Sequence, residues 1–169
     1  MKRVIDYLRR FSNGLEKVTG YVCMSLVAIM LSVVMIQVVL RMFRASVPWS
    51  EELSRMLLIW IGMLGAGIAA KEGLHVGVDF VISLLPRTTQ KVIAILINLI
   101  LITFLVFFAY QGYLSAVAAK RVLATTFEIT LFVPKLALPV GSVLMMIHLF
   151  YFAVKDIYEL IMGKTQEVM

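Results

Sequence analysis

Charged residues are scarce in this sequence, and the scarcity decides the class of protein. Asp, Glu, Lys and Arg make up 15% of the 169 residues, whereas the surface of a soluble domain is about 25–35% charged. Hydrophobic residues reach 62%, and the mean hydropathy is +0.97. An ordinary soluble domain is therefore excluded, and we expect a single integral membrane domain that covers residues 1–169.

Metal-binding and nucleophilic side chains are also few. Cys23 is the single cysteine, so a disulfide within the chain is excluded. One cysteine and two histidines, His75 and His148, cannot build a zinc site. Haem would need two axial ligands at similar depth, and His75 lies outside the apolar runs. A Gly-rich phosphate loop and a nucleophile elbow are missing too. We therefore expect no enzymatic activity and no bound cofactor.

Ionisable residues are nearly absent from the middle of the apolar runs. No acidic residue lies there, although a small proton-coupled exporter would need one. His148 is the exception, and such a residue marks a functional site by default. A neutral imidazole can instead bond a facing carbonyl, and we favour this packing role. The net charge of +6 comes from basic residues that flank the apolar runs, so it indicates membrane topology rather than nucleic-acid binding.

Four apolar runs are long enough to cross a bilayer, because about 20 helical residues traverse a hydrocarbon core about 30 Å thick. The predicted spans are residues 18–40, 53–70, 91–119 and 136–154. Segments 2–15, 79–85 and 122–134 are expected at the membrane interface. Segment 2–15 either lies on anionic lipid or leads straight into the first span. The predicted fold is an all-α integral membrane protein with four transmembrane helices plus short interfacial amphipathic helices.

Basic residues predict the orientation. With four spans, both termini lie on one side of the membrane. That side holds the larger share of Lys and Arg, including Lys2, Arg3, Arg9 and Arg10 before the first span. Because basic residues favour the cytoplasmic side, we expect both termini in the cytoplasm.

A charged helix start precedes the second span. Ser50 is the predicted N-cap, with Glu51 and Glu52 in the first turn, as the positive end of a helix dipole favours. A short link places this start beside the end of the first span, so the charges there are expected to form a salt-bridge network or a docking surface for a partner. The members of this cluster are Arg41, Arg44, Glu51, Glu52 and Arg55, with Trp49 in the interfacial aromatic belt.

Small residues recur along the second span. Gly62, Ala66 and Ala70 are spaced by four residues, and Gly65 lies beside them. In lipid, such a face lets another helix approach closely. We expect this face or the charged cluster to meet a partner protein.

Several short segments of the chain have a recognisable sequence. They are segments 49–55 and 57–62, Gly65-Ala66, and segments 75–79, 84–86 and 138–141. Together they resemble the small permease subunit of TRAP transporters, the DctQ-like family. The resemblance covers nearly the whole chain, and the part from Trp49 to Asp79 is the specific one.

The resemblance implies a tripartite, sodium-driven importer of an organic acid, sialic acid or a C4-dicarboxylate, in a bacterial inner membrane. A periplasmic protein would capture the substrate. A large membrane subunit would hold substrate and sodium and move as an elevator, and this chain would widen its static scaffold. Two alternatives stay open, a membrane anchor of a respiratory complex and an independent small transporter.

Overall fold

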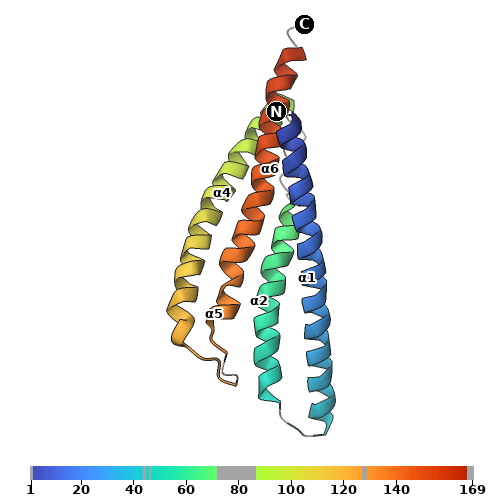
Figure 1. Cartoon of the computed structure of the whole chain (residues 1–169), viewed down its shortest axis with the longest axis vertical. Helices are drawn as coiled ribbons and strands as arrows, with labels where there is room; N and C mark the ends of the chain where they lie inside the picture. Colours follow the sequence, from blue (N-terminus) through green and yellow to red (C-terminus); the bar gives the residue numbers. More distant parts are fainter. Residues whose placement is uncertain (1, 44, 46, 72–86, 127–128, 167–169) are drawn as a thin grey trace.

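The chain folds as a bundle of long helices (Figure 1). The computed structural model describes residues 2–43, 45, 47–71, 87–126 and 129–166. The four long helices are α1 (Lys2–Met42), α2 (Pro48–Lys71), α4 (Arg87–Ala118) and α6 (Ala137–Gln166). Each contains a segment long and apolar enough to cross a membrane. The predicted all-α fold with four transmembrane helices is thereby confirmed.

Helix α6 is the central element of the bundle, because it packs on α1, α2 and α4. Helix α1 packs mainly on α2, its antiparallel neighbour, while α4 packs on the other side of α6 (Figure 1). The amino and carboxyl ends of the chain lie at the same end of the molecule (Figure 1). We refer to this as the terminal end of the bundle.

Glycines allow α6 to approach its neighbours closely. A Cβ atom added to Gly141 of α6 would lie 2.8 Å from Met63 Cβ and 3.0 Å from the Met63 carbonyl oxygen. A Cβ atom on Gly112 of α4 would lie 3.0 Å from Leu138 Cβ. Small residues at such crossings allow helices to pack closely in a lipid environment.

Helix α1 is continuous over 41 residues, which corresponds to about 60 Å at 1.5 Å per residue. The helix has no break between segment 2–15 and the predicted span 18–40. Segment 2–15 is thus a direct helical extension of the first span, as one of the two alternatives expected. Its position relative to the lipid surface stays a prediction.

The connection from α4 to α6 has more structure than the surface loop expected for residues 122–134. After a short helical turn, η1 (Ala119–Arg121), the chain forms an antiparallel bridge between Leu123 and Thr130. The Ala124 amide donates to the Ile129 carbonyl at 2.9 Å, and the Leu131 amide donates to the Val122 carbonyl at 2.8 Å. We call the described residues of this segment, 122–126 and 129–131, the 122–131 hairpin. Helix α5 (Phe132–Lys135) then leads into α6.

The predicted interfacial helix 79–85 lies outside the described residues, as do His75 and Arg44. The expectations for them stay predictions.

Candidate subunit interface

One face of α2 is exposed along most of the helix. Its exposed residues follow one another at intervals of three or four positions, which places them on one helical face. Leu58 and Ile59, in the middle of this face, are 57% and 40% exposed. We call it the α2 outer face; its members are Glu51, Arg55, Leu58, Ile59, Gly62 and Ala66.

The predicted small-residue face lies partly on the α2 outer face. A Cβ atom on Gly62 or Gly65 would meet nothing within 4 Å. Gly62 and Ala66 are exposed, while Gly65 and Ala70 are half-buried. Gly62 and Ala66 are therefore open to a helix from outside this chain.

The glycine of α2 that packs inside the bundle is a different one, and the sequence interpretation missed it. Gly67 is buried, and a Cβ atom there would lie 3.4 Å from Leu144 Cβ of α6. Gly67 and Leu64 form the buried side of α2. The spacing of the small residues could not show that Gly67 rather than Gly62 faces α6, because a small residue permits close packing on whichever side a partner lies.

Glu52 connects the start of α2 to the 122–131 hairpin. The backbone amide of Thr125 donates to Glu52 Oε1 at 2.8 Å, and the amide of Thr126 donates to Oε2 at 2.7 Å. Both carboxylate oxygens are therefore occupied by the chain itself. Arg55, one turn further along α2, is near enough for its charge to act on Glu52.

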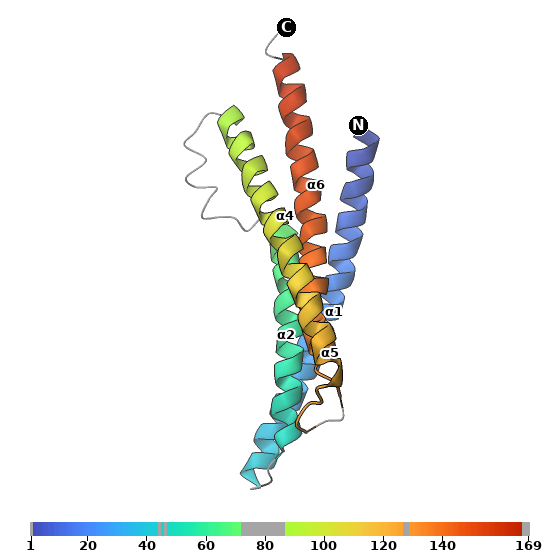
Figure 2. The same ribbon diagram turned by 90° about the vertical axis from the view of Figure 1, so that its left-hand side faces the viewer.

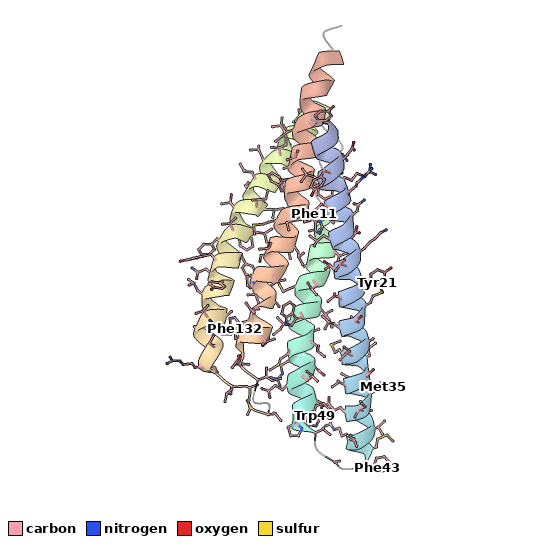
Figure 3. All side chains as sticks on the ribbon, in the orientation of Figure 1. Phe11, Tyr21, Met35, Phe43, Trp49 and Phe132 are labelled. Carbon is pink, nitrogen blue, oxygen red and sulfur yellow. The ribbon has the colours of Figure 1, made fainter. Side chains whose placement is uncertain are left out.

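The described charged residues of the cluster other than Glu52 lie at the surface. Glu51 accepts a hydrogen bond of 3.4 Å from Gln37 Nε2 at the surface. Arg41 and Arg55 are exposed. Trp49 is half-buried at the start of α2 (Figure 3), at the end of the bundle where the aromatic belt is expected. The role of the cluster as a partner surface stays a prediction.

The predicted N-cap at Ser50 is wrong. Helix α2 begins at Pro48, so Ser50 already lies in the first turn. Its hydroxyl donates to the Val47 carbonyl at 2.7 Å instead of accepting a backbone amide. Proline suits the first turn because its missing amide would have no partner there.

A heptad pattern runs along the inner side of α1. Buried or half-buried residues alternate at intervals of four and three, the spacing of a coiled-coil seam. Figure 3 shows Tyr21 and Met35 on the outer side of the helix, away from α2. We call the inner positions the α1 seam; they are Ser12, Glu16, Thr19, Cys23, Leu26, Met30, Val33, Gln37 and Leu40.

Polar members of the α1 seam bond across to other helices. Ser12 Oγ and His148 Nδ1 of α6 are joined by a hydrogen bond of 2.8 Å, and both residues are 1% exposed. Glu16 forms an ion pair with Lys71 at the end of α2. The Cys23 thiol lies 3.9 Å from the Ile61 carbonyl oxygen.

His148 therefore has a structural partner, as the favoured packing role requires, although that partner is a hydroxyl rather than the expected carbonyl. The Glu16–Lys71 pair was missed by the sequence interpretation. The heptad spacing of Ser12, Glu16 and Thr19 is the signal that could have found it.

Comparison with known proteins identifies the family. The profile of the family described as "Tripartite ATP-independent periplasmic transporters, DctQ component" matches residues 30–159. A protein of Haemophilus influenzae, whose name marks it as a candidate TRAP transporter small permease protein, is 31% identical over 96 residues, which are 56% of this chain and 60% of that protein. This chain is thus aligned with 60% and 62% of the lengths of two such Haemophilus relatives.

Two relatives have names that include a substrate. The sialic acid TRAP transporter small permease protein SiaQ of Vibrio cholerae is 26% identical over 142 residues, which are 83% of this chain and 80% of SiaQ. The sialic acid TRAP transporter permease protein SiaT of Haemophilus influenzae is 31% identical over 72 residues, which are 43% of this chain and 12% of SiaT. The resemblance seen in the sequence is confirmed. Since the family profile covers residues 30–159, this chain belongs to the DctQ family of TRAP transporter components.

Proposed function

We propose that this chain is the small membrane subunit of a TRAP transporter and that it docks a large permease subunit through the α2 outer face. The observation that carries the proposal is the open surface at Gly62 and Ala66, in a span whose opposite side is already packed on α6. An apolar, small-residue face whose glycine meets nothing in the described part of its own chain is suited to a second membrane helix.

The length of SiaT supports a large partner. The 72 residues that match this chain amount to 12% of SiaT, so a region similar to this chain occurs in a much longer permease. In our proposal the large subunit holds the substrate and sodium sites, and a periplasmic protein delivers the substrate. The small subunit lies in a bacterial inner membrane with both termini in the cytoplasm.

Sialic acid is our first choice of substrate, and a C4-dicarboxylate is the second. The support is the similarity to SiaQ over 83% of this chain. Uptake of labelled sialic acid by proteoliposomes that contain both membrane subunits and the binding protein tests this choice. Uptake of a C4-dicarboxylate without sialic acid uptake would make the C4-dicarboxylate the first choice of substrate.

The role proposed for this chain is a static scaffold. Among the described residues, several polar and ionisable side chains near the bundle interior are bonded to other side chains, as in the Glu16–Lys71 pair and the Ser12–His148 hydrogen bond. Groups bonded in this way support helix packing and leave the substrate to the large subunit. Solute flux into vesicles that contain this chain alone would contradict the proposal.

Leucine substitutions on the α2 outer face test the docking site. We expect Gly62→Leu and Ala66→Leu each to lower recovery of a tagged large subunit about tenfold or more, since overpacking costs about 1–3 kcal/mol. Co-purification from detergent extracts measures the effect.

Gly20→Leu is the matched control, because a Cβ atom at Gly20 of α1 also meets nothing within 4 Å. We expect it to leave recovery of the large subunit unchanged. Normal co-purification of the Gly62→Leu and Ala66→Leu variants would place the docking surface elsewhere.

A further inference from the structure

Five polar side chains from three helices meet near the terminal end of the bundle. Lys71 Nζ donates to Asn13 Oδ1 at 2.8 Å and forms the ion pair with Glu16, while Ser12 bonds His148. Helix α1 supplies three of these residues, and α2 and α6 supply one each. We call this set the polar clamp; its members are Ser12, Asn13, Glu16, Lys71 and His148.

The polar clamp lies where the long helices begin to separate. In Figure 2, α1, α4 and α6 diverge above the level at which α2 ends. Lys71 is the last residue of α2. The Lys71 ammonium group therefore contacts α1 at the last position of α2.

Few residues of α1 are fully buried in the bundle. In the described part of that helix, the buried residues are Ser12, Thr19 and Val33, so two of the three are polar. Lipid tails are as apolar as leucine side chains, so burial of apolar side chains gives no hydrophobic driving force between helices. Directional polar contacts add specificity to the van der Waals packing, because they are satisfied at one register only.

The charges of the clamp are partly withdrawn from water. The Lys71 side chain is 11% exposed and the Glu16 side chain 30% exposed. Removal of one partner from such a pair leaves the other charge poorly solvated and unpaired. Any displacement of α1 that separates Glu16 from Lys71 therefore raises the free energy of the folded chain.

We propose that the polar clamp is a positioning device that fixes the axial register of α1 against α2 and α6. The exposed Arg9 and Arg10 lie just before the clamp on α1, so the same contacts determine how far this basic turn extends from the bundle. The inference concerns this chain alone and does not rest on the proposed transport function.

The native thiol provides the test. Cys23 is half-buried on the α1 seam, seven positions after Glu16, and it is the single cysteine of the chain. Its rate of modification by N-ethylmaleimide, in the full chain purified in detergent, reports whether the seam stays closed. We expect Glu16→Lys and Lys71→Glu each to raise that rate about fivefold or more. A change of this size corresponds to the usual interaction free energy between contacting residues.

The charge swap separates a specific pair from a general loss of packing. The double variant Glu16→Lys/Lys71→Glu restores the pair, so we expect its rate to return to within about twofold of the native rate. Lys71→Arg should also stay near the native rate, because it keeps the donor and the charge. Lys17→Glu, an exposed change beside Glu16, is the matched control and should have no effect.

Where a charge reversal prevents folding, judged by gel filtration, Lys71→Gln supplies the comparison with a milder change. Native modification rates in Lys71→Gln or in both reversals would overturn the proposal. A charge swap that reacts as fast as the single reversals would overturn it as well.

Discussion

Glu51 and Glu52 are consecutive residues, yet the helix turns them towards different surroundings. Glu51 faces outward and accepts one long hydrogen bond from Gln37, whereas Glu52 accepts two short ones from backbone amides of the 122–131 hairpin. A carboxylate can accept at both oxygens, while an amide side chain has one accepting oxygen. Substitution of Glu52, with the same substitution of Glu51 as the control, therefore tests what holds the hairpin.

The Glu52→Gln variant should loosen the 122–131 hairpin. A glutamine side chain would place its NH₂ group, itself a donor, against one of the two amides, so we expect amide exchange at Thr125 or Thr126 to accelerate about fivefold or more. Hydrogen–deuterium exchange followed by mass spectrometry of the peptide that carries both residues measures this change. Glu51→Gln is the control and should exchange at the native rate; equal protection in both variants would show that Glu52 does not hold the hairpin.

Residue identity predicted the location of these charges but not their partners. The sequence places Glu52 in the first turn of α2, within a charged cluster that was expected to form a salt-bridge network or a docking surface. Its bonded partners, Thr125 and Thr126, are more than seventy positions away. Backbone amides carry no residue-specific signal, so the sequence could not indicate them.

At the scale of elements, the crossing of α2 and α6 depends on Gly141. The Cβ atom of an alanine there would meet Met63 Cβ at 2.8 Å and the Met63 carbonyl oxygen at 3.0 Å. These two atoms belong to the backbone or are fixed next to it, so they cannot move aside as a flexible side-chain end can. The two helices must therefore separate to accept even one methyl group.

We expect Gly141→Ala to lower the stability of the bundle by about 1–3 kcal/mol, the usual cost of overpacking. The measurement is the midpoint of thermal unfolding in detergent. Gly20→Ala is the control, since that Cβ atom meets nothing within 4 Å and alanine is the better helix former. A Gly141→Ala midpoint equal to or above that of the control would contradict the close crossing.

The existence of each long helix could be predicted, whereas the face that α2 buries could not. Apolar length reveals a span because the bilayer sets a minimum number of residues. In lipid, however, the buried and exposed sides of a span are both apolar. Gly62 and Gly67 show the consequence: both are glycines on one apolar helix, and only Gly67 lies inside the bundle.

At the scale of the whole molecule, both termini lie at the same end of the bundle (Figure 1). We predict that this end faces the cytoplasm, because the segment before the first span is rich in Lys and Arg. Fusions of a fluorescent protein that matures only in the cytoplasm should be bright at either terminus. Alkaline phosphatase fused at Val47, in the link between α1 and α2, should be active, since that link then faces the periplasm.

The reverse pattern, with dark terminal fusions and no phosphatase activity at Val47, would invert the topology. Bright fusions at one terminus only would contradict the even number of spans.

The central position of α6 determines when the bundle can assemble during synthesis. Helix α6 follows the other three long helices along the chain, so α4 must wait in the bilayer until its main neighbour has been synthesised. A nascent chain that stops before Ala137 keeps the α1–α2 hairpin but leaves α4 without its main helical neighbour. The membrane proteases that remove incomplete proteins would therefore meet an unpaired α4 at that stage, and the bundle can assemble only after α6 has entered the bilayer.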